Sequence, residues 1–584
     1  MENTEKKVLL SVNDLHVKFR VRGRILTAIR GVSLDFYENE SVAIVGESGS
    51  GKSVFTKTFA GMLEENGFIS DGRIIFNDPE IAETYTKYGK LERSIVDFTY
   101  NKLNKYSSLE FGAEIYREIL AMKAEYRAKF ELSDEEDLAF TEKKEDLQYR
   151  LTELQNLKQT IDPSKEKERL AEVREQIADL EAQLKALETE KADLIKKHRE
   201  QMKNDVAFKE AYEAKGAELA KKYTEIISTP ATEEMMARNM ILAKEIYLSV
   251  GRYGFAQRIK FIYKLLAAFK NAMRLGVDLN DENVKNDIFD TVVFRVRYID
   301  ETEEKLHGTC IINLAKVKYT KDWMQIRGRK IATVFQDPMT SLNPIITIGK
   351  QITSVILKHQ NCSELEARQR ALELMKKVGI PNAENRFDDY PFQYSGGMRQ
   401  RIVIAIALSC QPKILICDEP TTALDVTIQA QILKLLKDLQ KEFNYTIVFI
   451  THDLGVVANI ADRVAVLYAG QVVEVGTVEE VFYDPRHPYT WALLSSLPQL
   501  ADRNTKLYSI TGTPPSLYNA IVGDAFAPRN PYCLKIDTLK EPPMFQISET
   551  HFAKTWLLDP RSPKIEKPEA IADIHQKLMD AFNI

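Results

Sequence analysis

The segment from Gly46 to Ser53 has the residue types and the spacing that bind phosphate. It matches the pattern G-x-x-x-x-G-K-[ST] with Gly46, Glu47, Ser48, Gly49, Ser50, Gly51, Lys52 and Ser53. In this pattern backbone N–H groups surround the phosphates, the lysine reaches the β- and γ-phosphates, and the serine hydroxyl ligates Mg²⁺. A strand pattern, SVAIV, precedes the segment and a helical pattern follows it, as the motif requires. The sequence therefore predicts a site for ATP and Mg²⁺.

Two consecutive carboxylates, Asp418 and Glu419, follow a second apolar run, ILIC. A buried strand of this kind delivers its C-terminal residues to the sheet edge where ligands collect in open α/β sheets. Asp418 would hold Mg²⁺ through water, and Glu419 would polarise the attacking water as general base. The alternative, an acidic pair on the surface, is less favoured because the phosphate-binding segment is present.

A third segment, YSGGMRQ at 394–400, resembles the signature loop of ATP-binding-cassette (ABC) ATPases, whose usual form is LSGGQ. Other landmarks follow in that family's order: Gln336 in VFQDP resembles the Q-loop, Asp425 in Ala423-Leu424-Asp425 the D-loop, and His452 in ITHD the switch histidine. Longer stretches, including FQDPMTSLNP and PRHPYTWALLSSLP, resemble the D-type ATP-binding subunit of oligopeptide and dipeptide permeases. The resemblance covers about residues 8–77 and 312–558.

The resemblance implies a role for each matched residue. Gln336 would sense Mg²⁺ and the attacking water, Glu419 would be the catalytic base, and His452 would contact the γ-phosphate. The signature residues would reach the ATP held on an opposing subunit, and they are Ser395, Gly396, Gly397 and Gln400. Phe19 is the candidate for stacking on adenine, although an aromatic residue in this β-rich segment could equally belong to the core.

Strand patterns such as KILICDEP alternate with helical patterns such as QAQILKLLKDLQKEF, which is typical of α/β proteins. With the resemblance, this predicts an ABC-type P-loop cassette that has a RecA-like lobe, an antiparallel β subdomain and a helical signature subdomain. We expect residues 1–77 and 312–480 to form the cassette. Residues 481–584 would form the C-terminal extension of peptide permeases, and residues 78–311 a helical insertion that the family pattern does not include.

The predicted insertion is rich in Lys and Glu and has helical periodicity. Three- and four-residue spacing of apolar side chains predicts a short coiled-coil seam made of Leu170, Val173, Ile177, Leu180, Leu184, Leu187 and Leu194. A similar stripe starts at Leu147, and Asp162-Pro163-Ser164 breaks the chain between the two. We expect an antiparallel helical hairpin; alternatively, the stripe packs on its own domain.

Three further features of the insertion lead to predictions. Thr229 and Pro230 have the residue types of a helix N-cap and first helical residue. The run from Ile246 to Val277 lacks Asp and Glu and mixes basic with aromatic residues. It could lie on anionic lipid or contact RNA, or form an ordinary amphipathic helix with a solvated basic face. Residues 291–299 alternate like a strand, which we expect to rejoin the main sheet.

The C-terminal extension departs from its family at the positions of an iron–sulfur site. Related subunits often carry four cysteines there, in a pattern that resembles cluster ligation. At the matched positions this chain has Asp524, Asn530, Asp537 and Thr555. Because none of these side chains supplies a thiolate, we expect no cluster.

Composition limits the classes of protein to which the chain can belong. It has 584 residues, a formal net charge of −5 and five scattered cysteines. This balance argues against a protein that coats nucleic acid, and the spacing of the cysteines indicates neither a disulfide framework nor a zinc site. We find no signal peptide and no apolar run that could span a membrane. A protein of this composition that acts at a membrane needs other chains to cross it.

The resemblance implies that a single cassette requires a partner, because its signature loop would serve the ATP of another subunit. The resemblance implies an ATPase that powers oligopeptide uptake as a peripheral protein on the cytoplasmic face of the membrane. Its implied partners are a second, F-type ATPase subunit, two membrane-spanning permease subunits and an external peptide-binding protein, with no nucleic acid. The alternative is a coiled-coil ABC ATPase that acts on DNA or ribosomes, which the short seam and the PRHPYTWALLSSLP stretch disfavour.

Overall fold

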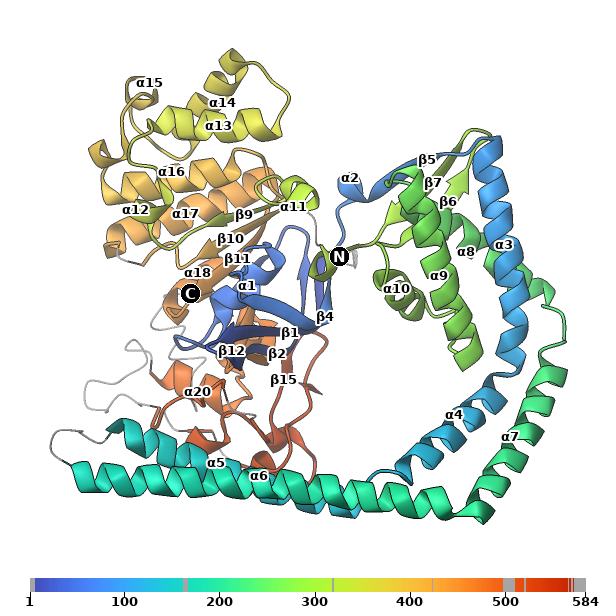
Figure 1. The fold of residues 1–584 in the computed structure, drawn as a ribbon. Helices are drawn as coiled ribbons and strands as arrows, with labels where there is room; N and C mark the ends of the chain where they lie inside the picture. The colour runs from blue at the N-terminus through green and yellow to red at the C-terminus, as the bar shows by residue number, and fades with distance from the viewer. Residues whose placement is uncertain are drawn as a thin grey trace. The chain divides into compact units, whose positions relative to one another are not determined.

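The computed structural model describes residues 6–160, 166–317, 320–422, 424–496, 510–518, 521–565, 567–568 and 571. The chain forms two compact units, one from Met1–Ala82 with Ile311–Ile584 and the other from Glu83–Cys310 (Figure 1). The predicted chain break at Asp162-Pro163-Ser164, Ala423 of the D-loop motif and the end of the PRHPYTWALLSSLP stretch lie outside the described residues.

The first unit is built on an eight-stranded sheet of order β14-β15-β13-β12-β3-β11-β10-β9. Its parallel strands are β3 (Ser41–Val45), β9 (Ile331–Val334), β10 (Ile414–Asp418), β11 (Thr446–Thr451) and β12 (Arg463–Tyr468). Its antiparallel strands are β13 (Gln471–Thr477), β14 (Phe545–Gln546) and β15 (Phe552–Ala553). All residues of β3 and β11 are buried. Their near-continuous apolar sequence suits strands that are covered on both faces.

A four-stranded antiparallel sheet of order β2-β1-β4-β8 completes the β structure of this unit. Its strands are β1 (Val8–Val21), β2 (Arg24–Tyr37), β4 (Gly67–Phe76) and β8 (Ile312–Asn313). Arg22 and Gly23 join β1 to β2 with φ values of 49° and 79°, as a two-residue hairpin turn requires. Phe76 pairs with Ile312, so the two cassette strands that flank the second unit in sequence are neighbours in this sheet.

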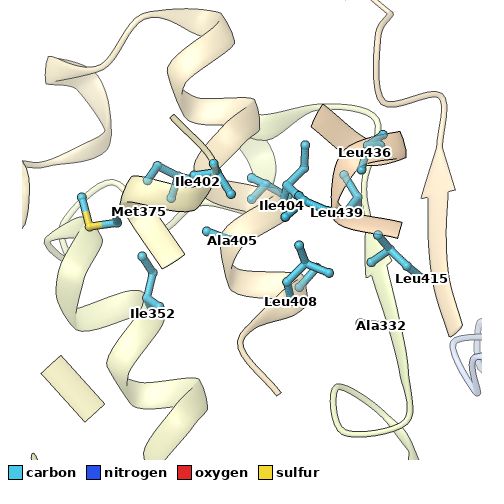
Figure 2. Close-up of a cluster of buried hydrophobic side chains, with 14 of the residues drawn as sticks. Ala332, Ile352, Met375, Ile402, Ile404, Ala405, Leu408, Leu415, Leu436 and Leu439 are labelled. Carbon is cyan, nitrogen blue, oxygen red and sulfur yellow. The ribbon is translucent and has the colours of Figure 1, made fainter. Parts of the chain in front are cut away.

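The helical part of the first unit surrounds α16 (Gly396–Leu408), which begins at the signature segment. Figure 2 shows Ile402, Ile404 and Leu408 of α16 among side chains from neighbouring helices and strands. Those neighbours include Ile352 of α13 (Ile348–His359), Met375 of α14 (Glu364–Lys377) and Leu436 of α17 (Val426–Phe443). Because α16 buries apolar side chains around its circumference, it lacks the polar stripe of a surface helix.

The remaining helices of the first unit are short. They are α1 (Lys52–Phe59), α2 (Pro79–Ala82), α11 (Thr320–Ile326), α12 (Pro338–Ser341), α15 (Ala383–Arg386), α18 (Leu454–Ile460), α19 (Val478–Tyr483) and α20 (Pro488–Ser495). The C-terminal residues belong to this unit as well, since β15 pairs with β13 through Ala553 and Glu474. The C-terminal segment therefore extends the sheet that carries the phosphate-binding loop.

The second unit has its own core, formed between helices and a three-stranded sheet. The sheet has the order β5-β7-β6, with strands β5 (Glu83–Lys87), β6 (Val296–Glu301) and β7 (Lys305–Cys310). The helices of this core are α3 (Lys90–Phe111), α8 (Glu233–Val250), α9 (Phe255–Leu275) and α10 (Glu282–Asp290). The strand predicted near 291–299 is β6, but the expectation that it rejoins the main sheet is wrong. Its alternating pattern defined a buried face and could not specify the neighbouring strand.

Two pairs of long helices form the rest of the second unit (Figure 1). α4 (Ala113–Ala128) packs on α7 (Val206–Ile226), and α5 (Asp134–Thr160) packs on α6 (Lys167–Asn204). Leu170, Val173 and Ile177 of the predicted seam are buried and contact Leu151 and Leu154 of α5.

Ion pairs fix the direction of α5 and α6. Asp137 of α5 pairs with Lys191 of α6, and Lys144 pairs with Glu188 at 3.0 Å. Since the residue number rises along α5 as it falls along α6, the two helices are antiparallel.

The start of α8 differs from the sequence-based expectation. The N-cap of α8 is Thr232, whose side chain accepts a hydrogen bond from the Met235 backbone N–H, so the prediction for Thr229 and Pro230 is wrong by three residues.

α9 buries an apolar face that includes Leu265 and Phe269. Three of its basic residues have internal partners: Arg258 donates to backbone oxygens, Lys270 lies over Tyr106 and Arg274 lies over Tyr116. These contacts favour the ordinary amphipathic helix over a lipid- or RNA-binding surface.

Candidate active site

The carboxyl ends of four neighbouring parallel strands bring the predicted site residues together. Strand order places β3, β11, β10 and β9 side by side. The phosphate-binding loop follows β3, His452 follows β11, Asp418 and Glu419 lie at the end of β10, and Gln336 follows β9. Parallel strands end at the same edge of a sheet, so residues far apart in sequence meet there.

The phosphate-binding loop has the backbone geometry that its glycines allow. Gly46 has φ 151°, and a Cβ at this position would lie 2.2 Å from the backbone oxygen of Leu467. Lys52 is buried, and its Nζ donates to the backbone oxygens of Gly46 and Glu47 at 2.8 and 2.9 Å. These hydrogen bonds hold the Lys52 ammonium against the carbonyls of the loop. To reach a bound phosphate, the ammonium would have to break them.

The side chains of Ser53 and Asp418 meet at the edge of the sheet. The Ser53 hydroxyl donates to Asp418 Oδ1 at 3.0 Å. Burial raises the pKa of Asp418, which the hydrogen bond from Ser53 opposes. Burial also lowers the pKa of Lys52, against the attraction of Glu419, Asp418 and Glu47. A buried Lys52 ammonium beside the half-buried Asp418 carboxylate favours a ligand that brings both phosphate and a cation.

Glu419 lies at the centre of a hydrogen-bonded group. Its carboxylate accepts from Gln336 Nε2 at 2.9 Å and from the Thr422 hydroxyl at 3.1 Å, and it lies 3.3 Å from His452 Nδ1. Glu419 has φ 45°, a left-handed conformation that is unfavourable for a side chain of this kind. Such strain costs about 1–3 kcal/mol and concentrates at functional sites. The backbone of Glu419 is thus held in the conformation that aims its carboxylate at Gln336 and His452.

The signature and D-loop residues cap helices rather than join this group. Ser395 is the N-cap of α16, and its hydroxyl accepts from the Met398 N–H at 3.4 Å. Asp425 is the N-cap of α17 and accepts from the Ile428 N–H at 2.9 Å. A Cβ at Gly397 would lie 2.7 Å from Ile428 Cγ2, so this glycine permits close packing of α16 on α17.

Two other predicted residues lie in less accessible places. Gln400 is 1% exposed because it lies one turn into α16, on the face shared with Val403 and Ile404. Its side chain is therefore not available to a neighbouring subunit in this structure. Phe19 lies on β1 beside Gly67 of β4, where a Cβ would meet its ring at 2.7 Å. The stacking of Phe19 on adenine stays a prediction.

Sequence reasoning missed three residues that contact the site. Thr422 donates to Glu419, and Tyr489 and Arg529 bind Glu47 of the phosphate-binding loop. Thr422 follows the carboxylate pair closely enough to suggest itself from sequence. Arg529 is 482 residues from Glu47, and no local pattern connects the two.

The four positions that match family cysteines hold local hydrogen bonds. Each side-chain oxygen accepts a backbone N–H: Asp524 from Phe526, Asn530 from Tyr532, Asp537 from Leu534 and Thr555 from Leu557. All four residues are buried, and burial raises the pKa of Asp524 to about 6. These oxygens stabilise turns and supply no thiolate, so the residues present do not fit an iron–sulfur cluster.

Comparison with known proteins decides the family. The family described as ABC transporter matches residues 29–221 and 296–422, which is more than half of the chain. The chain belongs to the ABC transporter family. This ABC protein also matches the family described as oligopeptide/dipeptide transporter, C-terminal region, over residues 473–536. The predicted α/β cassette architecture is confirmed.

Curated relatives of this ABC protein are similar over about half of its length. The oligopeptide transport ATP-binding protein AmiE of Streptococcus pneumoniae serotype 4 is 67% identical over 268 residues, which is 46% of this chain and 76% of AmiE. OppD of Bacillus subtilis (strain 168), also an oligopeptide transport ATP-binding protein, is 59% identical over 286 residues, or 49% of this chain and 79% of OppD. The dipeptide transport ATP-binding protein DppD of Lactococcus lactis subsp. cremoris is 57% identical over 274 residues, or 47% and 77%.

Among the described residues of this ABC protein, no helix is both long and apolar enough to span a membrane.

Proposed function

We propose that this chain is the ATP-hydrolysing subunit of an ABC importer and that it powers oligopeptide uptake through separate membrane subunits. The observation that carries the proposal is the meeting of Gln336, Glu419 and His452 beside the phosphate-binding loop. The match to an oligopeptide/dipeptide transporter C-terminal region supports the choice of substrate class. The alternative of an ABC ATPase that acts on DNA or ribosomes is not favoured, since the curated relatives are oligopeptide and dipeptide transport proteins.

The chemistry of the proposed site follows from its hydrogen bonds. Lys52 leaves the carbonyls of Gly46 and Glu47 to bind the β- and γ-phosphates, whose charge compensates its burial. Glu419 accepts a proton from the attacking water as general base, and Gln336 and His452 orient its carboxylate. His452 then lies beside the terminal phosphate.

Ser53 and Asp418 fit an Mg²⁺ ion, because their oxygens already lie 3.0 Å apart beside the loop and the Asp418 carboxylate is half-buried. Gln336 would approach the same ion through its side-chain oxygen. When bound with ATP, Mg²⁺ neutralises charge on the phosphates. Phe19 would stack on the adenine.

The signature segment serves a second cassette in this proposal. Ser395 is the N-cap of α16 and Gly396 and Gly397 begin it, at a helix end of the kind whose backbone N–H groups bind phosphate. These residues would contact the ATP held by the partner, and Asp425 would lie at the same interface. ATP then joins two cassettes, and its hydrolysis separates them.

The proposed assembly contains a second, F-type ATPase subunit, two membrane-spanning permease subunits and an external peptide-binding protein. The chain would lie on the cytoplasmic face of the membrane as a peripheral subunit. Exposed apolar side chains between the Q-loop and the signature segment would receive the permease subunits, and they include Ile345, Tyr390 and Phe392.

Two substitutions test the proposed reaction, both in cells and in the complex that is purified together with the chain. Glu419→Gln should keep ATP binding and slow hydrolysis by about 10²–10⁴-fold, because it removes the general base. Lys52→Ala should weaken ATP binding, and both variants should abolish uptake of labelled short peptides. Lys7→Ala and Glu38→Gln, which remove an exposed ion pair of 2.8 Å, are matched controls. Undiminished uptake in the Lys52 and Glu419 variants contradicts the proposal.

A further inference from the structure

Glu47 in the phosphate-binding loop is held from three sides. Its backbone N–H donates to the Tyr489 hydroxyl at 2.8 Å, and its backbone oxygen accepts from Lys52 Nζ at 2.9 Å. Its carboxylate accepts two hydrogen bonds from Arg529 Nη1 and Nη2, at 2.7 and 3.0 Å. Arg529 and Tyr489 lie outside the ATP-binding motifs, in the C-terminal part of the chain.

Arg529 is a buried residue, and each of its three side-chain nitrogens donates at least one hydrogen bond. Its side chain is 5% exposed. Besides Glu47, Arg529 donates from Nε to the Thr511 backbone oxygen at 3.1 Å and from Nη1 to the Tyr468 hydroxyl at 3.2 Å. The hydrogen bonds to Glu47 raise the pKa of the Arg529 guanidinium above its usual value. A bidentate arginine–carboxylate pair fixes direction as well as distance, which a single hydrogen bond does not.

An aromatic cluster sets the position of this pair. The rings of Tyr468 and Tyr489 have centroids 4.5 Å apart, and Phe526 lies 5.3 and 5.4 Å from them with its ring tilted across both. All three residues are buried. Phe526 precedes Arg529 by one short helical turn, Ala527–Arg529. The cluster therefore connects the turn that carries Arg529 to the residue that binds the backbone of Glu47.

A second connection reaches the other end of the loop. The Gly470 N–H donates to the Ser50 backbone oxygen at 2.8 Å. The neighbouring residue, Gln471, donates to Glu541 at 2.7 Å and accepts from Arg30 at 2.7 Å. Glu541 belongs to the C-terminal segment, so this segment supports the loop near Ser50 as well as at Glu47.

We infer that the C-terminal segment that carries Arg529 positions the phosphate-binding loop for ATP. Arg529 is a positioning residue in this inference, since it acts through Glu47 and does not itself contact nucleotide. A buried ion pair contributes little net stability, because desolvation offsets its attraction. Its directional hydrogen bonds instead select one conformation of the loop, which lowers the free energy that ATP binding must spend on ordering it. The inference rests on the proposed ATP site.

The test measures two quantities with the full-length chain: the Kd of a fluorescent ATP analogue and the number of analogue molecules bound per chain. Arg529→Gln should raise the Kd by about tenfold with the number bound unchanged, because the site is complete but its loop is no longer held. Arg529→Lys keeps the charge but loses the two parallel hydrogen bonds of the guanidinium. Its Kd should therefore lie between the Kd of the wild type and that of Arg529→Gln. Arg561→Gln is the matched control in the same segment, where Arg561 pairs with Asp559 and is exposed.

A double-variant cycle separates positioning through Glu47 from a general effect. Glu47→Gln should raise the Kd as Arg529→Gln does, and the double variant should bind no more weakly than either single variant. Additive losses overturn the inference, as does a wild-type Kd in Arg529→Gln. A fall in the number bound at unchanged Kd also overturns it, since this result means that Arg529 only maintains the folded fraction. Failure of the wild-type chain to bind the analogue contradicts the proposed function instead.

Discussion

At a single residue, backbone conformation and side-chain contacts can together fix where a reactive group points. Glu419 is the clearest case, because its left-handed backbone and its contacts with Gln336 and His452 define one position for the carboxylate. A residue without this backbone strain would gain stability but lose direction. The role of Glu419 thus depends on its backbone geometry as well as on its charge.

His487 leads to a prediction about pH. It is fully buried at the start of α20, where Nδ1 accepts the Tyr489 N–H at 3.0 Å. Burial lowers the pKa of His487 to about 3, whereas a histidine in the unfolded chain has a pKa of about 6.5. Because only the unfolded chain takes up this proton between those values, acidification below about pH 6.5 favours unfolding.

The measurement compares wild type with His487→Asn, in which the asparagine oxygen keeps the N-cap acceptor. We expect the free energy of unfolding in urea to fall between pH 7.5 and pH 5 by about 2 kcal/mol more in the wild type than in the variant. Other titrating groups, such as Asp524, contribute equally to both proteins and cancel. Equal decreases in the two proteins would contradict the assignment.

At the scale of elements, a buried ion pair connects α8 of the second unit to Arg295, the residue that precedes β6. Arg295 and Glu245 are each 2% exposed in their side chains, and two hydrogen bonds of 2.9 and 3.0 Å join them. Arg295 also donates to Glu282 of α10 at 2.9 Å. Burial acts to raise the pKa of Glu282, but hydrogen bonds from Lys285 and Arg295 bring it down to about 2. One guanidinium thus joins α8 and α10 to the segment that leads into β6.

Removal of one partner should be much worse than removal of both. Arg295→Met leaves the Glu245 carboxylate buried and unpaired, so we expect a loss of about 3–5 kcal/mol in the second unit. Arg295→Met with Glu245→Leu should recover most of this loss, since no buried charge remains. Native-state hydrogen exchange of the α8 amides measures both changes. A double variant as unstable as the single one would show that the ion pair itself provides the stability.

At the scale of the whole molecule, the second unit is inserted in sequence between two strands of the first unit. Phe76 and Ile312 pair in the same sheet, so the cassette strands on either side of the interruption already lie together. α2 belongs to the cassette: Asp78 is fully buried and pairs with Lys330 at 3.0 Å, and Glu80 pairs with Arg329 at 2.7 Å. The structural boundary therefore follows α2, at Glu83, and not residue 78.

Two deletions with the same flexible linker test this boundary. Removal of Glu83–Cys310 should leave the Kd for ATP within about twofold of the wild type, because no predicted ATP-site residue is lost. Removal of residues 78–311 should also lower the unfolding temperature, since it leaves the Lys330 ammonium buried without Asp78. The comparison needs thermal unfolding and nucleotide titration of both proteins. Loss of ATP binding in the shorter deletion would show that the inserted unit contributes to the site.

The sequence by itself determined the phosphate-binding loop, the carboxylates after β10 and the seam between α5 and α6. These features are local: a loop between a strand and a helix, the end of an apolar run, and a repeat of three and four residues. Parallel strands end at one edge, which predicted where Asp418 and Glu419 lie, and the family resemblance implied that Gln336 and His452 act at the same site.

Only the tertiary structure decided which elements become partners. Strand alternation in β6 did not reveal that β7, and not the main sheet, lies beside it. Nothing near Glu47 in sequence indicated Arg529, because a contact between residues 482 positions apart depends on how the C-terminal segment packs. Local patterns specify which face of an element is buried; the partner on that face is selected by packing, which is a property of the whole chain.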